Sequence, residues 1–255
     1  MKLNIPTKDN KNLEQVLAKI KASTRLEALL ECSNITAIDR MNYSDHGLTH
    51  VAIVSNIALK ILRNLIAAGV ETNIEKNYSL SKKDAEVVVV LASIFHDIGH
   101  IVHRKDHTQF SIIVANSILP TFLSEVYSER ESAIISSEVL HAIAAHDLDY
   151  LPLTLEAGVV CVSDALDMKE GRARIPFDAG KVDIHSVSAL AIDDVEISSG
   201  DKPVVIKIKM SNSSGIFQID NLLKPKLKTS GLEKYVQIKI EILGEEKKIL
   251  ENFEL

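Results

Sequence analysis

The sequence predicts a mainly α-helical domain followed by a small α+β region with an antiparallel sheet. Two patterns of apolar residues support this: helical spacing from about Leu13 to Met168, and alternation at every second position after about Pro176. A third observation is the length of 255 residues, which suits one large domain with a smaller one appended. We therefore expect a helical domain over residues 1–178 and an α+β appendage over residues 179–255.

Apolar stripes and start signals locate the helices of the first part. Two stripes at helical spacing begin at Leu13 and at Val51. Ser81 and Asp84 have the spacing of a capping box and open another helix, whose apolar run continues to Phe95. We expect further helices at residues 107–119, 132–146 and 154–168, with Pro120 and Pro152 between them.

Period-two alternation in the second part predicts half-buried strands with one solvated face. Apolar residues alternate with polar or charged ones at residues 204–210 and 236–242, and a turn at residues 199–203 precedes the first run. The tail from Lys247 to Leu255 is a candidate edge strand, and residues 217–228 are a candidate short helix that Pro225 would end or kink. These strands carry no acid–base pair, so we expect an oligomerisation, lid or ligand-sensing region.

Charge and composition exclude several functional classes. The net charge is −6 and there is no Trp, whereas nucleic-acid binders are usually basic and stack bases on aromatic rings. The polar N-terminus lacks the apolar core of a signal peptide, and no apolar run reaches the length of about 18 residues that a membrane span needs. Two cysteines, Cys32 and Cys161, are too few for a disulfide framework. We expect a cytoplasmic protein that binds neither a membrane nor a nucleic-acid polymer.

Histidine is the residue type that stands out. Eight of the nine histidines lie between His46 and His146. In the string FHDIGH, His96 and Asp97 follow an apolar helix and are spaced to serve neighbouring metal ions. A late carboxylate, Asp164, lies in an apolar helical stretch, where a buried charge needs a cation or a hydrogen-bond partner. The alternative is that the histidines are hydrogen-bonded core or helix-end residues and that Asp164 is half exposed.

The order of these residues resembles the HD-domain superfamily of metal-dependent phosphohydrolases. His50 precedes Val-Ala, the central His-Asp pair closes a helix, and Asp164 lies in a Ser-Asp-Ala-Leu-Asp string. Histidines between the central pair and the late aspartate resemble the binuclear branch of that superfamily. The resemblance covers Asp45 to Arg174, and the string from Thr154 to Arg174 is similar to archaeal HD proteins of unassigned substrate.

The resemblance implies an HD-domain helical bundle that holds two divalent metal ions per chain. Carboxylate and imidazole ligands together suit Mn²⁺, Fe²⁺, Co²⁺, Ni²⁺ or Zn²⁺ better than Ca²⁺. The ligands that it implies are Asp97, bridging both ions, with His50, His96 and Asp164 at the first ion and His107 and His146 at the second.

Three other histidines leave alternatives open. His141 and His146 are five residues apart and point in different directions on a regular helix, so only one of them should reach a shared metal ion. The resemblance implies His146, because binuclear members of the superfamily place the ligand at the helix end. His141 is then expected in packing or behind the ligands. His46 and His103 are expected behind the ligands or on the surface.

Further residues are candidates for donating a proton in the reaction and for binding the substrate phosphate. Asp97 and His100 are the expected catalytic residues, with His100 donating a proton to the leaving group; a helix-end hydrogen bond is the alternative for His100. Arg104, Arg172 and Arg174 are candidates for binding substrate phosphate through bidentate guanidinium groups. The alternative is that these arginines are solvated loop charges.

The preferred function is hydrolysis of a phosphomonoester or phosphodiester by metal-activated water. We expect a nucleotide-sized substrate, because the protein is acidic and poor in aromatic residues. One alternative is a non-catalytic regulatory module that binds metal or nucleotide and releases no phosphate. A second is a metal-dependent lyase or oxygenase, whose sign would be strict dependence on O₂. A homo-oligomer is compatible with the sequence.

Overall fold

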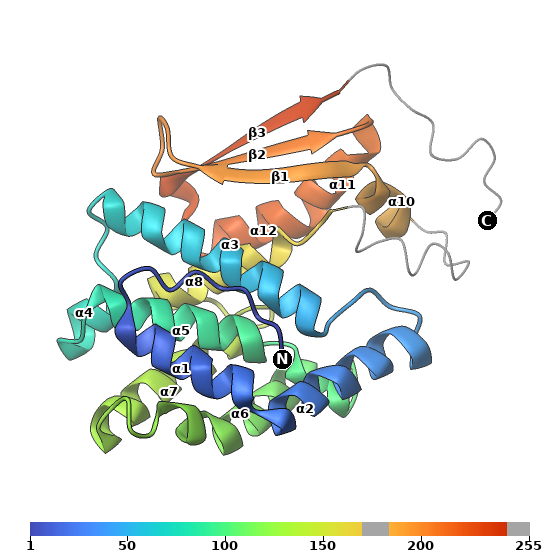
Figure 1. The fold of residues 1–255 in the computed structure, drawn as a ribbon. Coiled ribbons are helices and arrows are strands. Elements are labelled where there is room, and N and C mark those ends of the chain that lie inside the picture. Colours follow the sequence, from blue (N-terminus) through green and yellow to red (C-terminus); the bar gives the residue numbers. More distant parts are fainter. Residues whose placement is uncertain (170–183, 244–255) are drawn as a thin grey trace.

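The computed structural model describes residues 1–169 and 184–243, in which a helical bundle carries a three-stranded sheet on one side (Figure 1). The longer helices are α1 (Lys11–Ala22), α2 (Thr24–Ile35), α3 (Leu48–Ala67), α4 (Asn73–Tyr78), α5 (Lys82–Phe95), α6 (His107–Leu123), α7 (Glu129–Ala144) and α8 (Leu155–Ala165). The C-terminal region comprises α10 (Ile184–Leu190), β1 (Ile192–Ser198), β2 (Val204–Met210), α11 (Ile216–Gln218), α12 (Lys224–Thr229) and β3 (Val236–Ile242). Shorter 3₁₀ or π segments are η1 (Thr36–Arg40), η2 (Ile98–Ile101), η3 (Ser213–Gly215), η4 (Ile219–Leu223) and η5 (Glu233–Tyr235).

The predicted helical bundle with a small α+β region is confirmed. The capping box at the start of α5 is present, because both the backbone N–H and the hydroxyl of Ser81 donate to Asp84. Helix α7 begins at Glu129, earlier than the expected residue 132, because Ser128 and Glu131 form another capping box. Helix α6 continues through Pro120 to Leu123 instead of ending there. The expected strand at residues 247–255, Arg172, Arg174 and the boundary after residue 178 lie outside the described residues.

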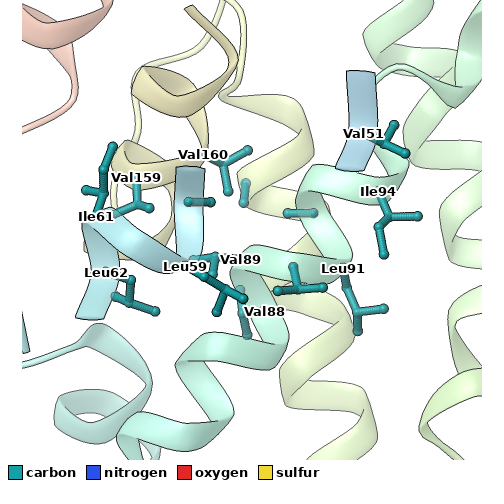
Figure 2. Packing of buried hydrophobic residues seen from close by; sticks show 14 of the residues in the cluster. Val51, Leu59, Ile61, Leu62, Val88, Val89, Leu91, Ile94, Val159 and Val160 are labelled. Atoms are coloured by element: carbon teal, nitrogen blue, oxygen red, sulfur yellow. The ribbon is translucent and has the colours of Figure 1, made fainter. Parts of the chain in front are cut away.

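Helix α5 runs through the core of the bundle and contacts α3, α7 and α8. Nearly all of its residues from Ala85 to Phe95 are buried, as expected for a helix that is apolar on all sides. Figure 2 shows side chains of α3, α5 and α8 meeting in this core, among them Val51, Leu59, Ile61, Leu62, Val88, Val89, Leu91, Ile94, Val159 and Val160. This packing fixes the C-terminal end of α5, where the His-Asp pair begins.

Helix α3 differs from the expectation that no segment is long and apolar enough to span a membrane. It has 20 residues, and its most apolar window of 18 residues has a mean hydropathy of 1.3. Half of that window is buried inside the protein, where α3 packs against α5 and α8. A core helix of a bundle meets the same criteria of length and composition, and α3 occupies a core position here.

The sheet is mixed, whereas the sequence predicted an antiparallel one. Strands β1 and β2 are antiparallel and are joined by the expected turn around Gly200. Strand β3 pairs with β2 in parallel, with Val204 opposite Val236. The chain between β2 and β3 passes through η3, α11, η4 and α12, which gives it the length that a parallel crossover requires. Alternation of apolar residues predicts a strand but carries no information about its direction.

The helical crossover attaches the C-terminal region to the bundle. Figure 1 shows α12 between the sheet and α8, and α12 and α8 are in contact. The contact is close because α8 carries Gly158: a Cβ atom there would lie 2.2 Å from the carbonyl oxygen of Ser230. Pro225 lies in the first turn of α12, where a missing N–H costs no helical hydrogen bond. The expected helix at residues 217–228 is therefore present in segments, and its last segment rests on α8.

Candidate metal centre

The carboxylate of Asp97 is the centre of the site. Asp97 follows the end of α5, with φ −107° and ψ 2°, and the chain then forms η2. The hydroxyl of Ser33 on α2 donates to the Asp97 carbonyl oxygen at 3.2 Å, which ties this turn to a second helix. The side chain of Asp97 is 6% exposed, and its two carboxylate oxygens contact different groups of histidines.

Three side chains surround the Oδ2 atom of Asp97. The Nε2 atoms of His50 and His96 lie 3.3 Å and 3.2 Å from it, and 3.1 Å from each other. Oδ1 of Asp164 lies 3.4 Å from Nε2 of His50 and 3.5 Å from Nε2 of His96. Helices α3 and α8 and the end of α5 thus bring four potential ligand atoms within 4.8 Å of one another. We call His50, His96, Asp164 and Oδ2 of Asp97 the Oδ2 cluster.

Two further histidines face the other oxygen, Oδ1. Nε2 of His107, the first residue of α6, lies 3.3 Å from Oδ1. Nε2 of His146, just after α7, lies 3.7 Å from Oδ1 and 3.3 Å from Nε2 of His107. We call His107, His146 and Oδ1 of Asp97 the Oδ1 cluster.

Gly99 allows His107 to approach Asp97. A Cβ atom at Gly99 would lie 2.0 Å from the carbonyl oxygen of His107 and 2.5 Å from the backbone nitrogen of Ser111. The Gly99 N–H also donates to the Ser111 hydroxyl at 2.8 Å. The glycine of the His-Asp-Ile-Gly string therefore lets α6 pack directly on η2, and this packing places the first residue of α6 at the Oδ1 oxygen.

Each histidine of the two clusters is oriented by a hydrogen bond from its outer nitrogen. Nδ1 of His50 donates to Oδ2 of Asp167 at 2.6 Å. The other three donate to backbone carbonyl oxygens at 2.7–3.0 Å: His96 to Ser93, His107 to Arg104, and His146 to Ile143. These bonds direct all four Nε2 atoms toward Asp97. The same pattern of an outer hydrogen bond and an inner lone pair is typical of metal-ligating histidine.

The charges within the clusters shift the pKa values of their side chains strongly. Burial alone would raise the pKa of Asp97 and of Asp164, but nearby positive charge outweighs it and holds both pKa values well below the usual range, with His96 the main source for Asp97 and Lys226 for Asp164. Burial would lower the pKa of His96, yet the carboxylates of Asp97 and Asp164 raise it to about 9. Burial and the charge of His96 lower the pKa of His146 to about 3.

The donor set fits a divalent transition metal. Imidazole nitrogen and carboxylate oxygen are ligands that suit Mn²⁺, Fe²⁺, Co²⁺, Ni²⁺ and Zn²⁺, and their convergence here is buried. The Nε2 atoms of His50 and His96 point at each other at 3.1 Å, so the contact requires either a proton or a cation between them. The residues that could hold metal are those of the Oδ2 cluster and of the Oδ1 cluster, with Asp97 shared, and His100 also lies close enough to Asp97 and His107 to join them.

His100 and Arg104 lie beside the clusters and contact each other. Nδ1 of His100 is 3.7 Å from Oδ1 of Asp97, but it donates to the Asp97 carbonyl oxygen at 2.8 Å. Nε2 of His100 accepts from Arg104 at 3.2 Å, and burial lowers the pKa of His100 to about 4. This lowered pKa favours the uncharged imidazole near neutral pH, and the role of His100 as a proton donor stays a prediction. The Arg104 guanidinium also lies 4.1 Å above the centre of the Tyr43 ring.

The remaining predicted residues either make their hydrogen bonds away from the clusters or lie in the segment that the structure does not describe. Nε2 of His141 accepts from the backbone N–H of Leu153 at 2.9 Å, so its bond is made to the loop after α7. Nδ1 of His103 accepts from the backbone of Lys105 at the surface. The placement of Arg172 and Arg174 belongs to the segment that the structure does not describe.

Three residues near the clusters were not predicted as site residues. His46 was expected behind the ligands or on the surface, and Asp167 and Lys226 had no assigned role. His46 is 4% exposed, and its Nε2 lies 3.9 Å from Oδ2 of Asp97; its position one turn before His50 was the available signal. Asp167 orients His50, and its place in the same short string as Asp164 could have indicated this. Lys226 contacts Asp164 from 62 residues farther along the chain, and no sequence pattern links the two.

The comparisons with known proteins agree with this site. A family model described as the HD domain matches residues 47–169, a range that contains every residue of the two clusters. The chain is also 43% identical over 215 residues to the uncharacterized protein MJ1020 of Methanocaldococcus jannaschii, covering 84% of this chain and 83% of that protein. The chain therefore belongs to the HD-domain family, whose members are generally metal-dependent phosphohydrolases and bind divalent metals.

Proposed function

We propose that this protein hydrolyses a nucleotide-sized phosphomonoester or phosphodiester with two divalent metal ions bound to its His-Asp clusters. The observation that carries the proposal is the division of Asp97: Oδ2 faces His50 and His96, whereas Oδ1 faces His107 and His146. A carboxylate shared in this way holds two cations side by side, as in enzymes that transfer phosphoryl groups.

The residues of the clusters have separable tasks in this proposal. Divalent ions would supply charge stabilisation to the phosphoryl group and lower the pKa of water. Asp97 would hold both ions, and the outer hydrogen bonds keep the imidazoles fixed. Arg104 is bound to His100 and stacked on Tyr43 beside Asp97, where a guanidinium is suited to orient a phosphate.

Exposure indicates where a substrate meets the clusters. The side chains of His50 and His96 are 0% exposed, whereas those of His107 and Asp164 are 12% and 16% exposed. A substrate therefore meets the clusters on the sides where His107 and Asp164 lie. A site this buried accepts a phosphate at the end of a small molecule more readily than one within a duplex, and the net charge of −6 also disfavours a polyanion.

Phosphate release from a panel of compounds tests the proposal. The panel contains mononucleotides, cyclic nucleotides, dinucleotides and an aryl phosphate, with protein loaded with Mn²⁺, Co²⁺ or Fe²⁺. We expect turnover of one compound class and a loss of about a thousandfold or more in Asp97→Asn, because the metal ions contribute several kcal/mol to such reactions. Asp149→Asn, at an exposed position, is the matched control and keeps full activity.

The possible negative results have different meanings. Metal binding without turnover of any compound would contradict the hydrolase and favour the regulatory module. Consumption of O₂ by the iron-loaded protein would favour oxidative chemistry instead. Turnover that is equal in Asp97→Asn and in the wild-type protein would show that the reaction occurs elsewhere.

A further inference from the structure

Lys226 of α12 is a buried charge outside the matched HD region. Its side chain is 9% exposed, and its Nζ lies 2.7 Å from Oδ2 of Asp164. Among the described residues, Asp164 is the one hydrogen-bond partner of this ammonium, which has three N–H groups to donate. Burying a lysine is costly unless it is paired, and an apolar residue would fill the same volume at lower cost. Because stability alone does not explain a lysine at this position, we ask what its charge does there.

Asp164 connects Lys226 to the Oδ2 cluster. Its Oδ1 atom faces the Nε2 atoms of His50 and His96, while its Oδ2 atom faces the ammonium. The ammonium thus lies beside the Oδ2 cluster, against the carboxylate of Asp164.

The more exposed edge of the Oδ2 cluster is at Asp164, and Lys226 lies against this carboxylate. The Asp164 side chain is more exposed than that of Asp97, at 16% against 6%, and the histidines of the Oδ2 cluster are fully buried. A phosphate that approaches bound cations along this edge would pass next to Asp164. Two N–H groups of Lys226 would then be available to its oxygens.

We propose that Lys226 binds a phosphoryl oxygen of the substrate, so that the C-terminal region completes the active site. This inference rests on the proposed hydrolase function. Close packing of Gly158 against Ser230 holds α12 on α8, and it keeps the lysine of one helix against the aspartate of the other. The C-terminal region is then more than an appendage, because it supplies a positive charge beside Asp164.

Binding of inorganic phosphate to the Mn²⁺-loaded protein tests the proposal by calorimetry. We expect Lys226→Met to weaken phosphate binding by about tenfold or more, since a hydrogen bond to a charged group is lost, while the number of Mn²⁺ ions per chain is unchanged. The control is Lys228→Met, which removes the same charge from an exposed position on the same helix and leaves phosphate affinity unchanged. Equal phosphate affinity in the wild-type protein and Lys226→Met would overturn the proposal and leave Lys226 as a counterion of Asp164.

A second measurement does not depend on the folding of any variant. In a crystal structure of the wild-type protein with Mn²⁺ and inorganic phosphate, we expect Nζ of Lys226 at about 2.7–2.9 Å from a phosphate oxygen. Phosphate bound at the clusters without contact to Nζ would overturn the proposal. Failure of the hydrolase function is a separate result: the wild-type protein would then release no phosphate from the panel, whatever Lys226→Met does to phosphate binding.

Discussion

The two carboxylate oxygens of Asp97 face surroundings that differ in charge and in the groups that orient the histidines. The Oδ2 cluster contains a second carboxylate, Asp164, and a third carboxylate, Asp167, orients His50 from behind. The Oδ1 cluster contains imidazoles alone besides Asp97, and backbone carbonyl oxygens orient both of them. The histidines of the first cluster are fully buried, whereas His107 of the second is 12% exposed.

This difference predicts unequal cation binding. Negative charge within and behind the Oδ2 cluster favours a cation there, and a carboxylate behind an imidazole raises its strength as a ligand. The Oδ1 cluster has less negative charge, because Asp97 is its one carboxylate among the described residues. We therefore expect the first cation to occupy the Oδ2 cluster and the second to bind more weakly in the Oδ1 cluster.

Removing the charge of Asp164 should have the largest effect on the molecule. In Asp164→Asn the metal-free protein loses about 3–5 kcal/mol of unfolding free energy, because Lys226 remains as a buried charge without a partner. The tighter of the two cation sites is lost at the same time. Urea denaturation and metal analysis measure the two effects.

An exposed pair provides the matched control for Asp164→Asn. Asp220 and Lys224 form an ion pair one helical turn apart, with side chains about half exposed. Asp220→Asn should change the unfolding free energy by less than about 0.5 kcal/mol. Equal effects of the two substitutions would contradict the role that we assign to the buried pair.

Adding a methyl group at Gly99 should affect the Oδ1 cluster selectively. In Gly99→Ala the new Cβ meets the His107 carbonyl oxygen, so α6 must shift and displace His107 from Asp97. We expect one bound ion per chain in place of two, with a loss of stability of about 1–3 kcal/mol from overpacking. Gly200→Ala is the control, since its Cβ would meet only a Val205 methyl group at 3.1 Å. Retention of both ions in Gly99→Ala would break the link between Gly99 and the Oδ1 cluster.

Removing the carboxylate behind His50 should have a smaller effect, confined to the other cluster. Asp167→Ala removes the acceptor of the His50 Nδ1–H, which lies 2.6 Å away. Affinity for the first cation should fall by about 10–100-fold, the usual cost of losing such a partner, and affinity for the second should be nearly unchanged. Competition with a fluorescent chelator measures both affinities, and an equal fall in both would contradict the separation of the clusters.

The smallest expected effect is the release of a proton on binding the first cation. The pKa of His96 is raised to about 9 in the metal-free protein, so its imidazole is protonated near neutral pH and must lose that proton to become a ligand. Affinity for the first cation therefore increases with pH up to about 9, by roughly tenfold per pH unit. Calorimetry in two buffers of different ionisation enthalpy counts the proton, and identical heats in both would contradict the protonated state of His96.

Much of the site could be predicted because its residues lie at helix ends and carry distinctive chemistry. One site residue, His50, lies in the first turn of the apolar helix α3, whereas His96 and Asp97 follow the apolar helix α5. The apolar pattern predicts that both helices pack in the core, and this packing fixes where their ends lie. The late aspartate was predicted to need a cation or a hydrogen-bond partner if it pointed inward. The structure brings these residues together at Asp97.

Other features depend on tertiary contacts that local sequence does not encode. Lys226 lies on a short helix among other lysines, and only the packing of α12 on α8 distinguishes it from Lys228. The lowered pKa of His100 follows chiefly from its burial, which a sequence motif does not show. The parallel direction of β3 is set by the helical crossover and not by the alternation of its residues.

The central claim is that Asp97 joins two cation sites. A Mn²⁺ titration of the wild-type protein, followed by electron paramagnetic resonance, tests it most directly. The account predicts two ions per chain with unequal affinities and a spectrum of magnetically coupled Mn²⁺ once both are bound, and no coupled spectrum in Asp97→Ala. A single bound ion, or two ions without coupling in the wild-type protein, would contradict it.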